Sequence, residues 1–175
     1  MLLPLWIISL YYQYRSTSRR WPLALDMLAV AGVVLLTGYG TGAKLVEIAK
    51  QGDAFSAKDL WTSQAMKCKF NNAVYHDGVI YGMDEGILAA MDVATGKRLW
   101  KGGRYGYGQL LLAGEHLIVT PGHGEVALVS ATPDQFTEVA RFPAIEGKTW
   151  NVPALAGGRL LVRNTTEMAS YQVAP

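Results

Sequence analysis

The stretch of sequence that decides the fold is AMDVATGKRLW, residues 90–100. Asp92 follows an apolar run and can accept hydrogen bonds from amides two or three residues later, as aspartate does in tight turns. Gly96 can adopt the positive φ that the corner of such a turn requires. Trp100 then closes the outgoing strand with a large flat side chain that needs a surface to bury against. The stretch predicts a strand, a tight turn and a second strand ending in a buried tryptophan.

Similar segments recur along the chain. Trp61 and Trp100 end the tetrapeptides KDLW and KRLW, and a period of about 40 residues indicates a repeated supersecondary unit. Each unit has two apolar strands around a short turn, at Asp77-Gly78, Gly114-Glu115 or Gly157-Gly158. A third strand follows each hairpin, and a fourth follows where the unit is complete. Four short antiparallel strands in about 40 residues are typical of one blade of a β-propeller.

An earlier blade is expected upstream, with strands at 33–36, 43–48 and 59–62. Its last loop, at 51–57, is longer than in the other units and lacks the Thr-Gly turn. We therefore predict an all-β fold, a partial β-propeller of about three to four four-stranded antiparallel blades over residues 22–175. Closing the ring would take missing blades from a longer sequence or a second copy of the chain, and we favour the first.

Residues 1–21 form an apolar and basic N-terminal segment that we assign to no blade. In one interpretation, its arginines flank a signal sequence or membrane anchor centred on the apolar run 23–36. The chain would then associate with a membrane through its N-terminus and lie in the periplasm or another extracytoplasmic compartment. In the other, residues 33–36 are a blade strand, since the run is shorter than the ~20 residues that span a bilayer. We favour the strand.

Composition narrows the classes of function. The chain has 175 residues, of which 50% are hydrophobic and 17% charged, as expected of one folded domain. The net charge is +2 and no basic stripe with interleaved aromatic residues occurs, so nucleic acid is not an expected partner. Cys68 is the only cysteine, which excludes an internal disulfide and a cysteine-based zinc site. The three histidines, His76, His116 and His123, show no His-x-x-x-His spacing, and we predict no metal site.

The opening stretch matches the pattern Ala-x-Asp-x-x-Thr-Gly-x-x-x-Trp at Ala90, Asp92, Thr95, Gly96 and Trp100. This pattern resembles the tryptophan-docking motif of the eight-bladed quinoprotein propellers and of PQQ-like repeat proteins. The resemblance covers roughly residues 22–173 and suits the C-terminal portion of such a ring. It implies that the tryptophan of each blade packs on the neighbouring blade. Phe142 stands where the next repeat would carry its tryptophan.

The resemblance implies two functions. The first is a non-catalytic scaffold that presents a propeller face to a protein partner, as does the propeller lipoprotein of the bacterial outer-membrane β-barrel assembly machinery. The alternative is a fragment of a PQQ-dependent quinoprotein oxidoreductase of the alcohol dehydrogenase type. In that family PQQ sits with a Ca²⁺ ion beside two adjacent cysteines, and this chain has a single cysteine. We expect the scaffold, with no catalytic residue and no cofactor; PQQ and calcium belong only to the alternative.

Polar and aromatic residues precede the first strand of successive repeats. These positions are Lys69, Asn71, Asn72, Arg104, Tyr107, Gln109, Lys148, Trp150 and Asn151. Equivalent positions in successive blades lie around one face of the ring, so these residues form a candidate binding surface for a ligand or peptide. The alternative, which we favour, is that they satisfy backbone hydrogen bonds between blades.

Overall fold

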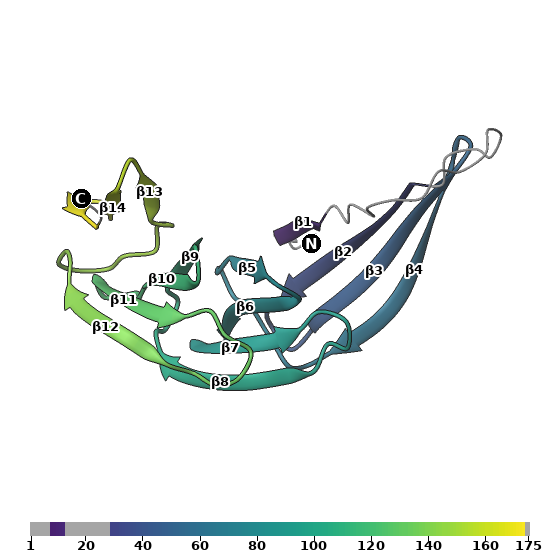
Figure 1. Ribbon diagram of the computed structural model, residues 1–175, viewed down its shortest axis with the longest axis horizontal. Coiled ribbons are helices and arrows are strands. Elements are labelled where there is room, and N and C mark those ends of the chain that lie inside the picture. The colour runs from purple at the N-terminus through teal and green to yellow at the C-terminus, as the bar shows by residue number, and fades with distance from the viewer. Residues whose placement is uncertain (1–7, 13–28, 174–175) are drawn as a thin grey trace, which may run out of the picture.

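The computed structural model describes residues 8–12 and 29–173. Within these residues the chain is all-β, and its strands form four antiparallel sheets, three of four strands and one of three. The sheets follow one another along an open arc, with β4, β8 and β12 on its outer rim (Figure 1). The expected all-β architecture of antiparallel blades is confirmed.

Each sheet uses strands that are consecutive in the sequence. The first contains β1 (Ile8–Tyr12), β2 (Ala29–Thr37), β3 (Gly42–Gln51) and β4 (Ala54–Ser63). The second contains β5 (Ala73–His76), β6 (Val79–Asp84), β7 (Ile87–Asp92) and β8 (Arg98–Arg104). The third contains β9 (Gln109–Ala113), β10 (His116–Thr120), β11 (Glu125–Ser130) and β12 (Glu138–Pro143). The last contains β13 (Ala154–Ala156), β14 (Arg159–Arg163) and β15 (Met168–Gln172).

The first sheet differs from the expectation in two respects. The long loop expected at 51–57 is instead a tight turn, because Gly52 adopts a φ of 59° and the β3–β4 ladder continues to Gln51 opposite Ala54. The segment 1–21, which we left outside the blades, contributes β1. This strand pairs with β2 from Ile8 opposite Leu36 to Tyr12 opposite Gly32, which satisfies backbone groups along that edge of β2.

The remainder of the N-terminal segment, including its arginines, lies outside the described residues. The prediction of a signal sequence or membrane anchor falls on that part of the chain. In the part of the chain that the structure describes, no helix is long and apolar enough to cross a membrane.

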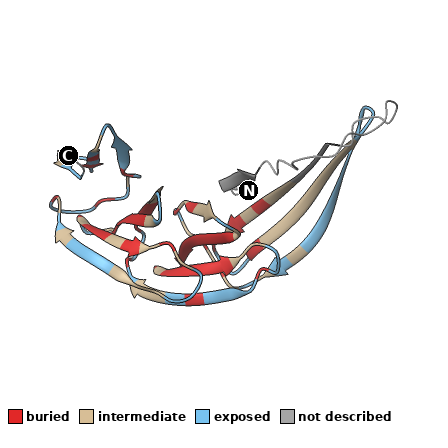
Figure 2. Cartoon of the chain, viewed as in Figure 1, coloured by how far each residue is buried: buried red, intermediate tan, exposed pale blue. Residues whose placement is uncertain are grey.

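The core lies between neighbouring sheets. One apolar cluster joins the first sheet to the second through Leu36 and Met91, a second joins the second sheet to the third, and a third joins the third sheet to the last through Ile118 and Leu160. Buried residues gather on the middle strands, and much of the outer strands is exposed (Figure 2). Each of the two middle sheets therefore buries its two faces against its two neighbours.

The turn after β7 carries the docking surface for the preceding sheet. Thr95 N donates to Asp92 Oδ1 at 2.7 Å, and Gly96 adopts a φ of 68°. Trp61 of β4 donates from Nε1 to Val93 O at 2.9 Å, and its ring packs on Gly96, where an added Cβ would lie 2.7 Å from the indole. The first sheet is thus held on the turn of the second.

The same relationship recurs one sheet further on. Trp100 of β8 pairs opposite the fully buried Ala90 and donates from Nε1 to Thr132 O at 2.7 Å. Its ring lies 5.9 Å from that of Phe136, in the loop before β12. At the last junction Phe142 packs edge-on against Tyr171 of β15, with ring centroids 5.0 Å apart. An aromatic residue of each outer strand therefore reaches the next sheet.

Candidate functional site

The loops that connect successive sheets meet on one face of the molecule. We call these loops, residues 64–72, 105–108 and 144–153, together with the β2–β3 turn at 38–41, the ladder face. Each of the three loops hydrogen-bonds to a turn within the next or preceding sheet: Glu85 N to Lys67 O at 3.3 Å, Tyr105 N to Gly86 O at 2.9 Å and Thr149 N to Gly122 O at 3.1 Å. These backbone bonds fix the loops relative to one another across the sheets.

Four exposed rings run in sequence along this face and form what we call the aromatic ladder: Tyr39, Phe70, Tyr107 and Trp150. The ring centroids are 6.3 Å apart from Tyr39 to Phe70, 6.3 Å from Phe70 to Tyr107 and 6.0 Å from Tyr107 to Trp150. The rings are 43–77% exposed, so they belong to the surface and not to the core. Large contiguous apolar surface of this kind marks interaction sites.

Two of the rings extend from strained backbone. Tyr39 has a φ of 56° and Phe70 a φ of 57°, in the left-handed region that bulky residues rarely occupy. Such conformations cost on the order of 1–3 kcal/mol and persist where the surrounding structure imposes them, often at binding sites. The strained backbone of these two neighbouring residues marks the same surface as a candidate binding site, independently of how exposed the rings are.

Cations lie at both ends of the ladder. Lys69 Nζ lies 5.2 Å from the centroid of Tyr39, and Lys148 Nζ lies 3.5 Å from that of Trp150. Both are cation–π contacts, which position an ammonium group beside a ring. The carboxylate of Glu85, in the β6–β7 turn, lies 3.3 Å from Nζ of Lys67 in the loop 64–72, so these two charges balance each other.

The amides predicted on this face join two sheets. Asn72 Nδ2 donates to Leu110 O at 2.6 Å, and Leu110 N donates to Asn72 Oδ1 at 3.0 Å. Gln109 Nε2 donates to Phe70 O at 2.6 Å, while Asn71 Nδ2 donates to Gly108 O. These side chains hold the backbone on both sides of the ladder and so fix the positions of its rings.

The structure therefore divides the nine candidate residues. Lys69, Tyr107, Lys148 and Trp150 belong to the ladder and its ends, whereas the three amides lie between sheets. Arg104 is exposed at the end of β8, and Asn151 is half-buried beside Trp150. Tyr39 and Phe70 are not among the nine residues predicted for this face. The available signal was positional, since Phe70 precedes the Asn71-Asn72 pair and Tyr39 stands between two glycines.

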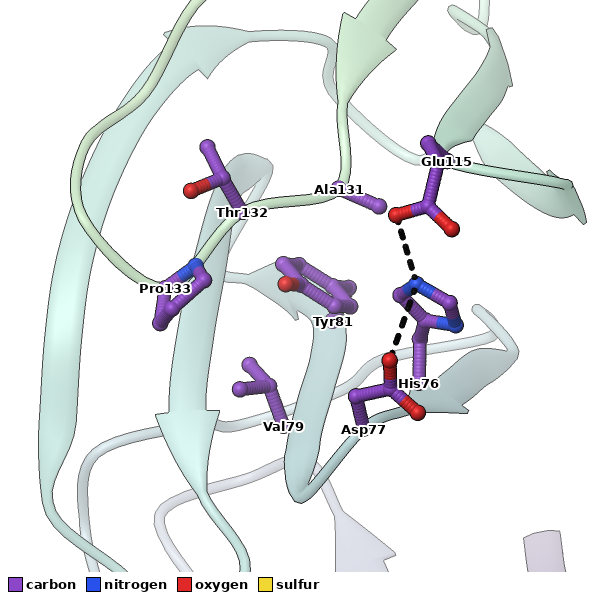
Figure 3. Close-up of a pocket in the computed structure, with 8 residues that line it drawn as sticks. All are labelled: His76, Asp77, Val79, Tyr81, Glu115, Ala131, Thr132 and Pro133. Atoms are coloured by element: carbon purple, nitrogen blue, oxygen red, sulfur yellow. Dashed lines mark hydrogen bonds and ion pairs between the residues drawn. The ribbon is translucent and has the colours of Figure 1, made fainter.

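Away from the ladder face, a pocket of about 200 Å³ lies between the second and third sheets among the hairpin turns (Figure 3). His76 Nε2 lies 3.1 Å from Glu115 Oε2 and 3.8 Å from Asp77 Oδ2. The hydroxyl of Tyr81 is buried without a hydrogen-bond partner among the described residues, and burial, reinforced by nearby carboxylates, raises its pKa to about 12. In the part of the chain described, no group of three or more His, Cys, Asp or Glu side chains is arranged to hold a metal ion.

Comparison with solved structures identifies the architecture. The chain is similar to the computationally designed Ika4 protein, with a TM-score of 0.54 and 10% identity over 82% of this chain and 86% of that one. It is similar also to BamB from Moraxella catarrhalis, a β-propeller, with a TM-score of 0.53 and 14% identity. The fold is β-propeller-like. The match covers 82% of this chain but 43% of BamB. No protein-family model and no curated protein matches the sequence.

Proposed function

We propose that this chain is a non-catalytic β-propeller scaffold that binds a protein partner through the ladder face. The observation that carries the proposal is the aromatic ladder, four exposed rings in continuous contact across successive sheets. Tyrosine and tryptophan are enriched at the centres of protein interfaces because they bury large areas with few rotatable bonds. Binding of this kind needs only side chains of the chain itself, so the proposal includes no cofactor and no catalytic residue.

The proposal extends to the class of repeat and to the location. The packing of Trp61 on Gly96 and of Trp100 on the next loop supports a PQQ-like repeat, since those proteins are expected to dock their blades through tryptophan. The resemblance to envelope propellers supports a place in the bacterial envelope.

Site-specific photo-cross-linking tests the proposal. A benzoylphenylalanine group replaces Tyr107 of the full chain in cells that express the chain naturally. The control carries the same group in place of Phe55, an exposed ring on β4 that lies outside the ladder face. We expect a discrete protein adduct from position 107 and none of that size from position 55. Identical adducts from both positions, or none from 107, would refute the proposal.

A further inference from the structure

We infer that the aromatic ladder binds an extended acidic segment of the partner, about seven residues long, with carboxylates near both ends. The inference rests on the proposed function and names the chemistry of its ligand. Three features of the ladder support it: the spacing of its rings, the charges at its ends and the rigidity of its backbone.

The spacing of the rings matches that of a β-strand. In an extended chain each residue advances about 3.2–3.4 Å and alternate side chains share a face, so same-face neighbours recur every 6.4–6.8 Å or so. The ladder steps are 6.3, 6.3 and 6.0 Å. Positions one, three, five and seven of a peptide would therefore meet successive rings from Tyr39 to Trp150.

The positive charges at the two ends of the ladder favour a ligand with negative charges at its own ends. Lys69 and Lys148 place an ammonium group at the first ring and at the last. The middle rings, Phe70 and Tyr107, have no lysine or arginine over them among the described contacts, so apolar side chains suit positions three and five. Carboxylates at positions one and seven would gain charge-assisted contacts with the lysines.

The ladder is held in place before any ligand arrives. Gln109 of the third sheet donates to the carbonyl of Phe70 itself, and Asn72, two residues later, donates to Leu110 O of that sheet. Trp150 packs against Gly122, where an added Cβ would lie 3.3 Å from the indole nitrogen. A preorganised surface loses less conformational entropy on binding, which favours a short linear ligand.

Fluorescence polarisation with labelled peptides tests the inference. The probe is DTVTVTD, and the comparison peptides are KTVTVTK, which reverses the end charges, and DTTVVTD, which breaks the alternation. We expect DTVTVTD to bind at least tenfold more tightly than either. Phe70→Asn should weaken it at least tenfold, because asparagine tolerates the positive φ while the ring is lost. Lys69→Glu with Lys148→Glu should reverse the preference towards KTVTVTK.

Matched variants on β4 serve as controls. Phe55→Ser and Lys50→Glu alter another exposed ring with a lysine over it, and both should leave peptide affinity unchanged. The inference would be overturned by equal affinity for the three peptides or by equal losses from Phe55→Ser and Phe70→Asn. A row of exposed rings can also stack on sugars, so binding of the oligosaccharide cellohexaose in place of the peptides would overturn it too. A position-107 adduct without peptide binding would refute the acidic segment and leave the proposed function standing. Peptide binding without that adduct would refute the proposed function and leave standing the preference of the ladder for an acidic peptide.

Discussion

Trp61 in the outer strand of the first sheet packs its indole directly on Gly96 in a turn of the second, and also donates to Val93 O at 2.9 Å. Ser63 adds a hydrogen bond from Oγ to Gly96 O at 2.5 Å. A side chain at residue 96 would occupy the space of the ring. The glycine of the Thr-Gly turn is therefore required for contact between sheets as well as for its positive φ.

Gly96→Ala should separate these two requirements. We expect the alanine to clash with Trp61 and to lower the free energy of unfolding by about 1–3 kcal/mol beyond the backbone strain. Gly78→Ala is the matched control, because Gly78 also has a positive φ, of 83°, but has no atom within 4 Å of an added Cβ. Urea denaturation of both variants measures the difference. Equal losses in the free energy of unfolding would show that the packing of Trp61 does not require a glycine at position 96.

Replacement of Trp100 should weaken the next junction. Trp100→Ala removes a ring that is 8% exposed together with its bond to Thr132 O, at an expected cost of ~3–5 kcal/mol. Trp100→Phe keeps most of the packing and loses the hydrogen bond, at a cost of about 1 kcal/mol from that bond. Thermal unfolding should rank wild type, phenylalanine and alanine in that order. A melting temperature unchanged in Trp100→Ala would refute the docking role.

Asn72→Ala tests the bonding role of the amides. The variant leaves Leu110 N and Leu110 O without their partner across the sheets, so we expect a loss of about 1–3 kcal/mol in stability. Asn151→Ala is the comparison, since the structure describes no side-chain hydrogen bond for Asn151. Chemical denaturation should distinguish the two. A loss from Asn151→Ala as large as that from Asn72→Ala would contradict the assignment.

Cys68 should report on global unfolding. Burial raises the pKa of its thiol to about 12, so the native thiol stays protonated and shielded at about pH 8. Because the folded pKa lies above the unfolded one, this contribution to stability is complete below about pH 8.5 and declines as the pH rises towards 12. We expect labelling by a thiol reagent only at the rate of unfolding. Rapid labelling of native protein would show that the site opens locally.

The repeat could be predicted from sequence where local chemistry dominates. Asp92, Gly96 and Trp100 combine a turn former, a residue free to take positive φ and a ring that must be buried, and the sheet formed around them is the one expected. The hairpin turns at Asp77-Gly78 and Gly157-Gly158 follow the same logic. Phe142 shows that the junction accepts another aromatic residue when its partner, Tyr171, supplies the second ring.

The aromatic ladder and the strand β1 could not be predicted in the same way, because they depend mainly on contacts between residues far apart in the sequence. Phe70 and Tyr107 are adjacent only because successive sheets stack, so their spacing cannot be read from either loop alone. Tyr39 takes its positive φ in the β2–β3 turn, and tyrosine, which rarely adopts that conformation, gives no sequence signal for it. The strand Ile8–Tyr12 was missed because its partner, β2, lies beyond a long intervening segment.

The central claim is that the ladder face binds a protein partner, and competition against the Tyr107 cross-link tests it most directly. Unlabelled wild-type chain, added in excess, should suppress the adduct formed from position 107. Chain carrying Phe70→Asn should fail to suppress it, while Phe55→Ser should compete as well as wild type. Equal suppression by Phe70→Asn and by wild type would contradict the account.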